Sequence, residues 1–234
     1  MGQHVSIHGP DGTFAAYLAE PASGQGPGIV VLQEIFGVNA VVRDLADHLS
    51  GLGYFALAPD LFWRLQPGVD ISDRTDGEWQ QALALMNRFD PEAGVADIKA
   101  TIAHLRARDG VAKVGALGHC LGGLMAFLTA ARTDSDATVG YYGVNIQDRL
   151  AEADQIAKPL LLHIAGEDGF VPAPAREKIL AGVKHNALVT PYVYAGVDHA
   201  FARPGGKNFN MSAAATANAR TEAFFHQHLA PHPD

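Results

Sequence analysis

Short apolar runs of strand length alternate with segments of helical periodicity along most of the chain, and this alternation limits its fold more than any other feature. Strands are expected at 29–32, 54–58, 113–117, 138–142, 160–165 and 188–194. Helices are expected at 41–52, 77–89, 91–108, 121–131, 173–183 and 212–228. Such alternation is typical of an α/β fold, in which helices cover both faces of a mostly parallel central sheet.

The size of the chain suits a single domain. Its 234 residues, 48% of them hydrophobic, are enough to bury one sizeable core. The first 18 residues predict two short strands around a turn at 8–12, and residues 60–75 predict a long loop. We therefore expect one domain over residues 1–234.

Composition and charge exclude several classes of protein. The chain carries 17 basic and 25 acidic residues, a net charge of −8, which disfavours binding to nucleic acid. The start of the chain does not resemble a signal peptide, and no apolar run is long enough to span a membrane. A single cysteine cannot form an internal disulfide, which is consistent with a cytoplasmic protein. We expect a monomer or a small homo-oligomer.

The most informative segment joins the strand at 113–117 to the helix at 121–131. It reads Gly-x-Cys-x-Gly over residues 118–122, which is a nucleophile elbow with cysteine in place of serine. The sharp turn puts strain on Cys120, and glycine at 118 and 122 avoids a Cβ clash with nearby backbone. The turn also sets the sulfur at a helix N-terminus, where the N–H of Leu121 is one oxyanion donor. A buried structural cysteine is the simpler alternative.

A cysteine nucleophile needs a base, and the base needs a group that orients it. Asp168 follows a glycine turn after the strand at 160–165, and His199 follows the strand at 188–194. This is the chain order of the α/β-hydrolases: nucleophile, acid, histidine. Taken singly, Asp168 could be a turn residue and His199 a solvated loop residue. The three in order, each after a strand, favour a Cys120–His199–Asp168 triad.

Two more residues follow the apolar strand at 29–32. Glu34 is expected near the elbow and partly buried, which is costly for a carboxylate that has no task or partner. The simpler alternative is an exposed glutamate at a strand end. The N–H of Ile35 lies where this fold usually places its second oxyanion donor.

These segments together resemble the dienelactone hydrolase (carboxymethylenebutenolidase) family over nearly the whole chain. The resemblance rests on residues 33–39, 59–61, 89–95, 118–123, 139–144 and 199–203. It implies an α/β-hydrolase fold and opening of a lactone ring by a Cys–His–Asp triad, matched here by Cys120, His199 and Asp168. It further implies that Glu34 holds the resting thiol and takes its proton when substrate arrives.

The resemblance also implies substrate-binding residues. Members of the family bind a substrate carboxylate with two arginines, and Arg203 matches one of them. Trp79 stands where an ungapped count places the other, and Leu83 stands where the family has a tyrosine; Arg74 is the nearest upstream arginine. Losing one charge-assisted contact costs about 1.5–3 kcal/mol, enough to change substrate preference. In addition to Arg203 and Trp79, Phe36 and Tyr142 within the shared segments are substrate-binding candidates.

The sequence therefore predicts a carboxylic ester hydrolase that acts on a small ester or lactone through a thioester. A carboxylesterase of broader, more apolar specificity is the alternative. A class I glutamine amidotransferase is disfavoured because Phe201 stands where that class has its glutamate. A nucleotide-binding module is disfavoured because the glycine spacing is wrong and no acidic residue ends the next strand. No metal-binding motif is present, and we expect no cofactor.

Overall fold

The computed structural model describes residues 2–230, which form two units. The first contains residues 2–116 and residue 230, and the second spans Leu117–Leu229. The expectation of one domain over the full chain stays a prediction.

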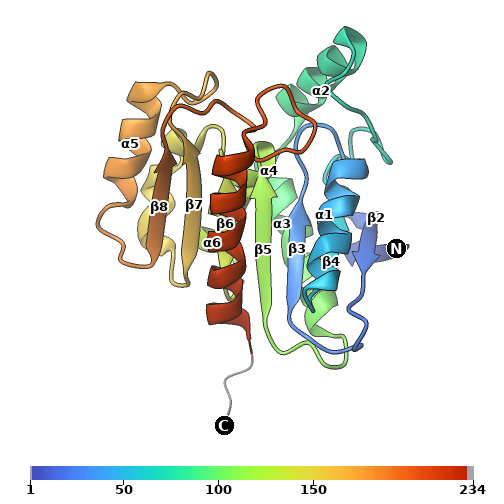
Figure 1. The fold of residues 1–234 in the computed structure, drawn as a ribbon. Helices are drawn as coiled ribbons and strands as arrows, with labels where there is room; N and C mark the ends of the chain where they lie inside the picture. The colour runs from blue at the N-terminus through green and yellow to red at the C-terminus, as the bar shows by residue number, and fades with distance from the viewer. Residues whose placement is uncertain (1, 231–234) are drawn as a thin grey trace. The chain divides into compact units, whose positions relative to one another are not determined.

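The first unit is a sheet with a helix on each face. A hairpin of two antiparallel strands pairs with β4, and β4 pairs in parallel with β3, so the strand order is β1-β2-β4-β3. In Figure 1, α1 lies in front of β3 and β4 and α3 lies behind them. Every residue of β3 and β4 is buried, as expected for strands covered on both sides. The elements are β1 (Gln3–Gly9), β2 (Gly12–Ala19), β3 (Gly28–Leu32), α1 (Ala40–Gly51), β4 (Phe55–Pro59), α2 (Asp76–Arg88) and α3 (Pro91–Arg106).

The second unit contains the end of β5, because the boundary between the units falls after Ala116 within this strand. Strands β6, β7 and β8 pair in parallel in that order beside β5. Helix α4 packs on β6, α6 contacts β7, and α5 packs against two short 3-10 helices. Helix α4 is buried from Leu121 to Ala131, which explains why it is apolar on all sides. The elements are β5 (Val114–His119), α4 (Leu121–Arg132), β6 (Thr138–Tyr141), η1 (Ile146–Asp148), η2 (Leu150–Gln155), β7 (Leu160–Ala165), α5 (Ala173–Val183), β8 (Val189–Tyr194) and α6 (Met211–Leu229).

The predicted helices and strands are confirmed with shifts of one or two residues at most ends. Proline and polar caps explain the accuracy at several helix starts: the Asn39, Thr75 and Asp90 side chains accept backbone N–H groups at the starts of α1, α2 and α3. The 3-10 helices η1 and η2 were not expected. They are too short to show a hydrophobic period.

A buried polar network joins α6 to the strands of the second unit. His163 on β7 is fully buried, and its ring nitrogens lie 2.8 Å from the Tyr194 hydroxyl and 2.9 Å from the Thr221 hydroxyl. The Thr221 hydroxyl is 2.6 Å from that of Tyr141, and Arg220 donates to Tyr194. Burial, helped by His119 and Arg220, lowers the pKa of His163 to about 3, so this ring is neutral in the folded protein.

Among residues 2–230 there is no helix with the length and apolar character that a membrane span requires.

Candidate active site

Cys120 occupies the sharp turn between β5 and α4. Its φ of 57° and ψ of −115° are strained for a residue with a side chain, as the elbow motif predicts. A Cβ on Gly118 would lie 2.0 Å from the Gly122 carbonyl oxygen, and one on Gly123 would lie 2.6 Å from the Tyr141 oxygen. These glycines therefore allow the backbone to pack closely around the turn.

Asp168 and His199 form a buried pair on neighbouring loops. His199 Nδ1 lies 3.0 Å from Asp168 Oδ2 and 3.2 Å from Oδ1. The N–H groups of Phe170 and Val171 also donate to Asp168 Oδ1, at 2.8 and 3.2 Å. The carboxylate is thus fixed by its own loop, and it orients the imidazole with the other ring nitrogen left for a second contact.

The electrostatics of His199 link it to both predicted partners. Burial by itself lowers the pKa of His199, but the hydrogen bonds and charges of Asp168 and Cys120 outweigh it and raise the pKa to about 10. The causes include a side-chain hydrogen bond between Cys120 and His199. The structure therefore brings Cys120, His199 and Asp168 together in that order, with the imidazole between sulfur and carboxylate.

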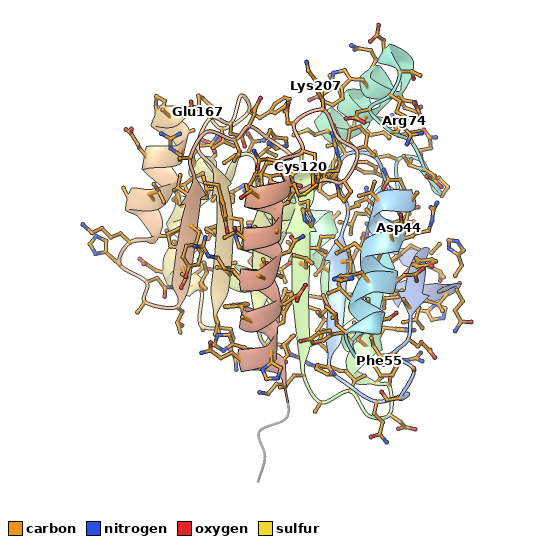
Figure 2. The ribbon with its side chains drawn as sticks, in the orientation of Figure 1. Asp44, Phe55, Arg74, Cys120, Glu167 and Lys207 are labelled. Carbon is orange, nitrogen blue, oxygen red and sulfur yellow. The ribbon has the colours of Figure 1, made fainter. Side chains whose placement is uncertain are left out.

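The loops that carry these groups follow the strands of the second unit at one end. Asp168 follows β7, and His199 follows β8. Figure 2 shows Cys120, Glu167 and Lys207 at the same end of this unit, and Glu167 directly precedes Asp168 in the chain. This is the carboxyl end of the parallel strands, where open α/β sheets carry their functional loops.

Aromatic rings surround the imidazole. The ring of Tyr142 meets that of His199 edge to face with centroids 5.0 Å apart, and Phe170 does so at 4.8 Å. Tyr142 also has a positive φ of 36°, and its N–H donates to the His163 carbonyl at 2.7 Å. Tyr142 therefore lies beside the predicted base, and it is 1% exposed. Phe170, which is 54% exposed, was not predicted from the sequence.

Asp198 and Asn208, which were not predicted from the sequence, contact the main chain of His199. Asp198 Oδ1 accepts the N–H of His199 at 2.6 Å and that of Gly169 at 2.8 Å. Asn208 donates to Asp198 Oδ2 and to the His199 carbonyl. Only the position of Asp198 directly before His199 could have drawn attention to it. Arg203 lies half-buried on the same loop, where its N–H donates to the Ala200 carbonyl.

The other predicted site residues belong to the first unit. Glu34 and Ile35 follow β3 and are both buried, so the alternative of an exposed glutamate is wrong. The rings of Phe36 and Trp79 lie together with centroids 6.1 Å apart. Arg74 is exposed just before α2 (Figure 2).

The described residues contain no group of three or more His, Cys, Asp or Glu side chains arranged to hold a metal ion.

Comparison with known proteins finds similar sequences over almost the whole chain. The model of the Dienelactone hydrolase family matches residues 14–229. A Pseudomonas putida carboxymethylenebutenolidase is 42% identical over 222 residues, which cover 94% of each chain. An Azospirillum brasilense protein provisionally named a carboxymethylenebutenolidase is 53% identical over 232 residues, 94% of this chain and 96% of that protein.

A solved structure shows the same fold. A Klebsiella pneumoniae protein, provisionally described as a dienelactone hydrolase, superposes with a TM-score of 0.86 at 26% identity, covering 97% of this chain and 99% of that one. The predicted α/β-hydrolase fold is thereby confirmed. With a family model that spans almost the whole sequence and relatives of this similarity, the chain belongs to the dienelactone hydrolase family.

Proposed function

We propose that this protein hydrolyses a small ester or lactone of the carboxymethylenebutenolide class, using Cys120 as nucleophile, His199 as acid and base, and Asp168 to orient His199. Family membership supports the hydrolase class. The observation that carries the mechanism is the contact series from Cys120 through His199 to Asp168, with Nδ1 of the imidazole 3.0 Å from the carboxylate.

The first half of the reaction forms a thioester. The Cys120 thiolate attacks the substrate carbonyl, and the carbonyl electrons move to oxygen. As the first residue of α4, Leu121 has an N–H with no acceptor inside the helix, so it can donate to this oxyanion. When the intermediate collapses, the bond from carbon to the ring or ester oxygen breaks, and the leaving oxygen takes a proton from the His199 imidazolium.

The second half releases the acid. His199, now neutral, removes a proton from water, and the resulting hydroxide attacks the thioester carbon. Collapse breaks the carbon–sulfur bond, which returns the Cys120 thiolate beside the His199 imidazolium and frees a carboxylic acid. Asp168 stays ionised and keeps the imidazole in one orientation throughout.

Residues outside the triad complete the proposal. On the family resemblance, Glu34 holds the resting thiol, takes its proton when substrate arrives and returns it to the thiolate after the acid leaves. On the same resemblance, Ile35 gives the second oxyanion N–H, and Arg203 binds a substrate carboxylate. The contact of Tyr142 with the His199 ring supports its assignment as a substrate-binding residue. The aromatic pair of Phe36 and Trp79 supports a second candidate, hydrolysis of neutral, more apolar esters.

Substitution of the nucleophile tests the proposal. C120A removes the attacking atom, so kcat/KM for a dienelactone and for an aryl ester should fall by about 10³-fold or more, since loss of a nucleophile has effects of that order. The melting temperature should stay near that of the wild type. Mass spectrometry of wild type quenched during turnover should find the acyl group on Cys120. Full activity of C120A would refute the mechanism.

A further inference from the structure

We propose that Asp198 is a positioning residue for His199: its carboxylate joins the loop that carries the base to the loop that carries the acid. The inference rests on the proposed function, since it gives Asp198 a role only if His199 and Asp168 act in the reaction.

The Asp198 carboxylate collects donors from both loops. Oδ1 accepts the N–H of His199 at 2.6 Å and the N–H of Gly169 at 2.8 Å. Oδ2 accepts from the Asn208 amide at 3.3 Å, and the same amide donates to the His199 carbonyl at 3.0 Å. His199 is therefore held through both its N–H and its carbonyl, and Gly169 directly follows Asp168 in the chain.

This side chain continues a series of backbone hydrogen bonds between the two loops. The Gly166 N–H donates to Tyr194 at 2.7 Å, and the Glu167 N–H donates to Val197 at 2.9 Å. A Cβ on Gly166 would lie 2.6 Å from the Tyr194 oxygen, so the loops approach closely there. The next bond in the series comes from Gly169, which directly follows Asp168. Its N–H donates to the Asp198 carboxylate instead of to a backbone carbonyl.

Loss of the Asp198 carboxylate would disturb the contact between His199 and Asp168. The strained Ala200, with a φ of 62°, directly follows His199, and the chain turns sharply there. Without the carboxylate, the His199 main chain would lose the bond at its N–H, and the Gly169 N–H would lose its acceptor. A displacement of 1 Å at a reacting group can cost about 100-fold in rate. Asp198 thus acts on the reaction through His199, without contact to the substrate.

The test compares three variants at the two loops. D198A removes all three hydrogen bonds and should lower kcat by about 10- to 100-fold with little change in KM. D198N keeps an oxygen for the two N–H groups and should recover most of that loss. N208A removes the two hydrogen bonds of the Asn208 amide but keeps those from the His199 and Gly169 N–H groups to Asp198. Its kcat should therefore fall less than that of D198A. N208A also probes the same link if D198A does not fold.

A matched control separates positioning from stability. Asn186 makes three hydrogen bonds elsewhere in the second unit, to the Ala153 and Ile156 carbonyls and from the Leu188 N–H. N186A should lower the melting temperature at least as much as D198A while kcat stays near the wild-type value. The rate of Cys120 alkylation by iodoacetamide gives a readout that needs no substrate, because the chain has a single cysteine. D198A should alter this rate and N186A should not.

The outcomes also distinguish this inference from the proposed function. If C120A abolishes hydrolysis and D198A keeps wild-type kcat and alkylation rate, the triad stands and the role of Asp198 is refuted. An equal loss of kcat in N186A, or a D198A defect confined to KM, also refutes it. Hydrolysis that persists in C120A overturns the triad itself.

Discussion

At the scale of the residue, Cys120 is one of four non-glycine residues with a positive φ in the part of the chain that the structure describes. Its positive φ is strained, and it persists because the surrounding backbone leaves the turn no alternative. The N–H of Cys120 donates to the Tyr141 carbonyl at 3.0 Å, and its own carbonyl accepts from Gly123 and Leu124. The sulfur is thus held in place by main-chain bonds on both sides of the turn.

Gly118 should tolerate no larger residue. In G118A the added Cβ would lie 2.0 Å from the Gly122 oxygen, so the free energy of unfolding should fall by about 2–4 kcal/mol. Urea denaturation measures this change. G51A is the control, because a Cβ there meets nothing within 4 Å. Equal stability of both variants would show that the close approach at the elbow does not matter.

The raised pKa of His199 predicts how stability depends on pH. Because the folded pKa is about 10 and the unfolded value about 6.5, the stabilisation is complete below pH 6.5 and is lost as pH rises toward 10. Urea unfolding at several values between pH 6 and 10 should therefore show a steeper loss for wild type than for H199Q. Parallel curves would contradict the assigned contacts.

At the scale of the element, the loops after β7 and β8 carry the proposed acid and base, while α2 carries Trp79, where the family resemblance places an arginine. Thr75 caps α2, and Glu78 in its first turn accepts the hydroxyls of Ser72 and Thr75. This well-fixed start holds the helix that presents Trp79 to Phe36. Substrate preference is therefore expected to depend on this helix.

Restoring an arginine at position 79 should favour charged substrates. W79R adds the charge that the family resemblance places there, so kcat/KM for a carboxylate-bearing lactone should rise about 10-fold relative to a neutral aryl ester. W79L removes the ring without adding charge and serves as the control. If both variants change the two substrates alike, Trp79 does not set the preference.

At the scale of the whole molecule, the sequence predicted most of the fold and named Cys120, His199 and Asp168, whose contacts support the proposed triad. Strands such as β3 are continuously apolar, and helices such as α3 begin with a cap and a proline, so their positions are set by local chemistry. The contact of Asp198 with Gly169, and those of Phe170 and Tyr142 with His199, could not be predicted. They depend on how loops distant in sequence meet, which no local pattern encodes.

Acid should destabilise the protein through His163. The pKa of His163 is about 3 in the folded protein and about 6.5 in the unfolded chain. Between these pH values the unfolded chain binds a proton at His163 and the folded protein does not. The free energy of unfolding should fall by about 1.4 kcal/mol per pH unit from this residue between those values. H163Q should show a shallower slope in urea unfolding between pH 4 and 6.5. An unchanged slope would contradict the neutral, buried ring.

The network around His163 has a further consequence, because every member must supply or receive one hydrogen. Arg220 can only donate to Tyr194, and Tyr141 donates to Asn218. Because each hydroxyl has one hydrogen to donate, all hydrogen bonds of the network then run in the same donor-to-acceptor direction, from Arg220 to Asn218. Tyr194 then donates to Nδ1 of His163, and Nε2 carries the ring's hydrogen toward Thr221. The interior of the second unit thereby selects a single tautomer, which ¹⁵N chemical shifts of labelled histidine would identify.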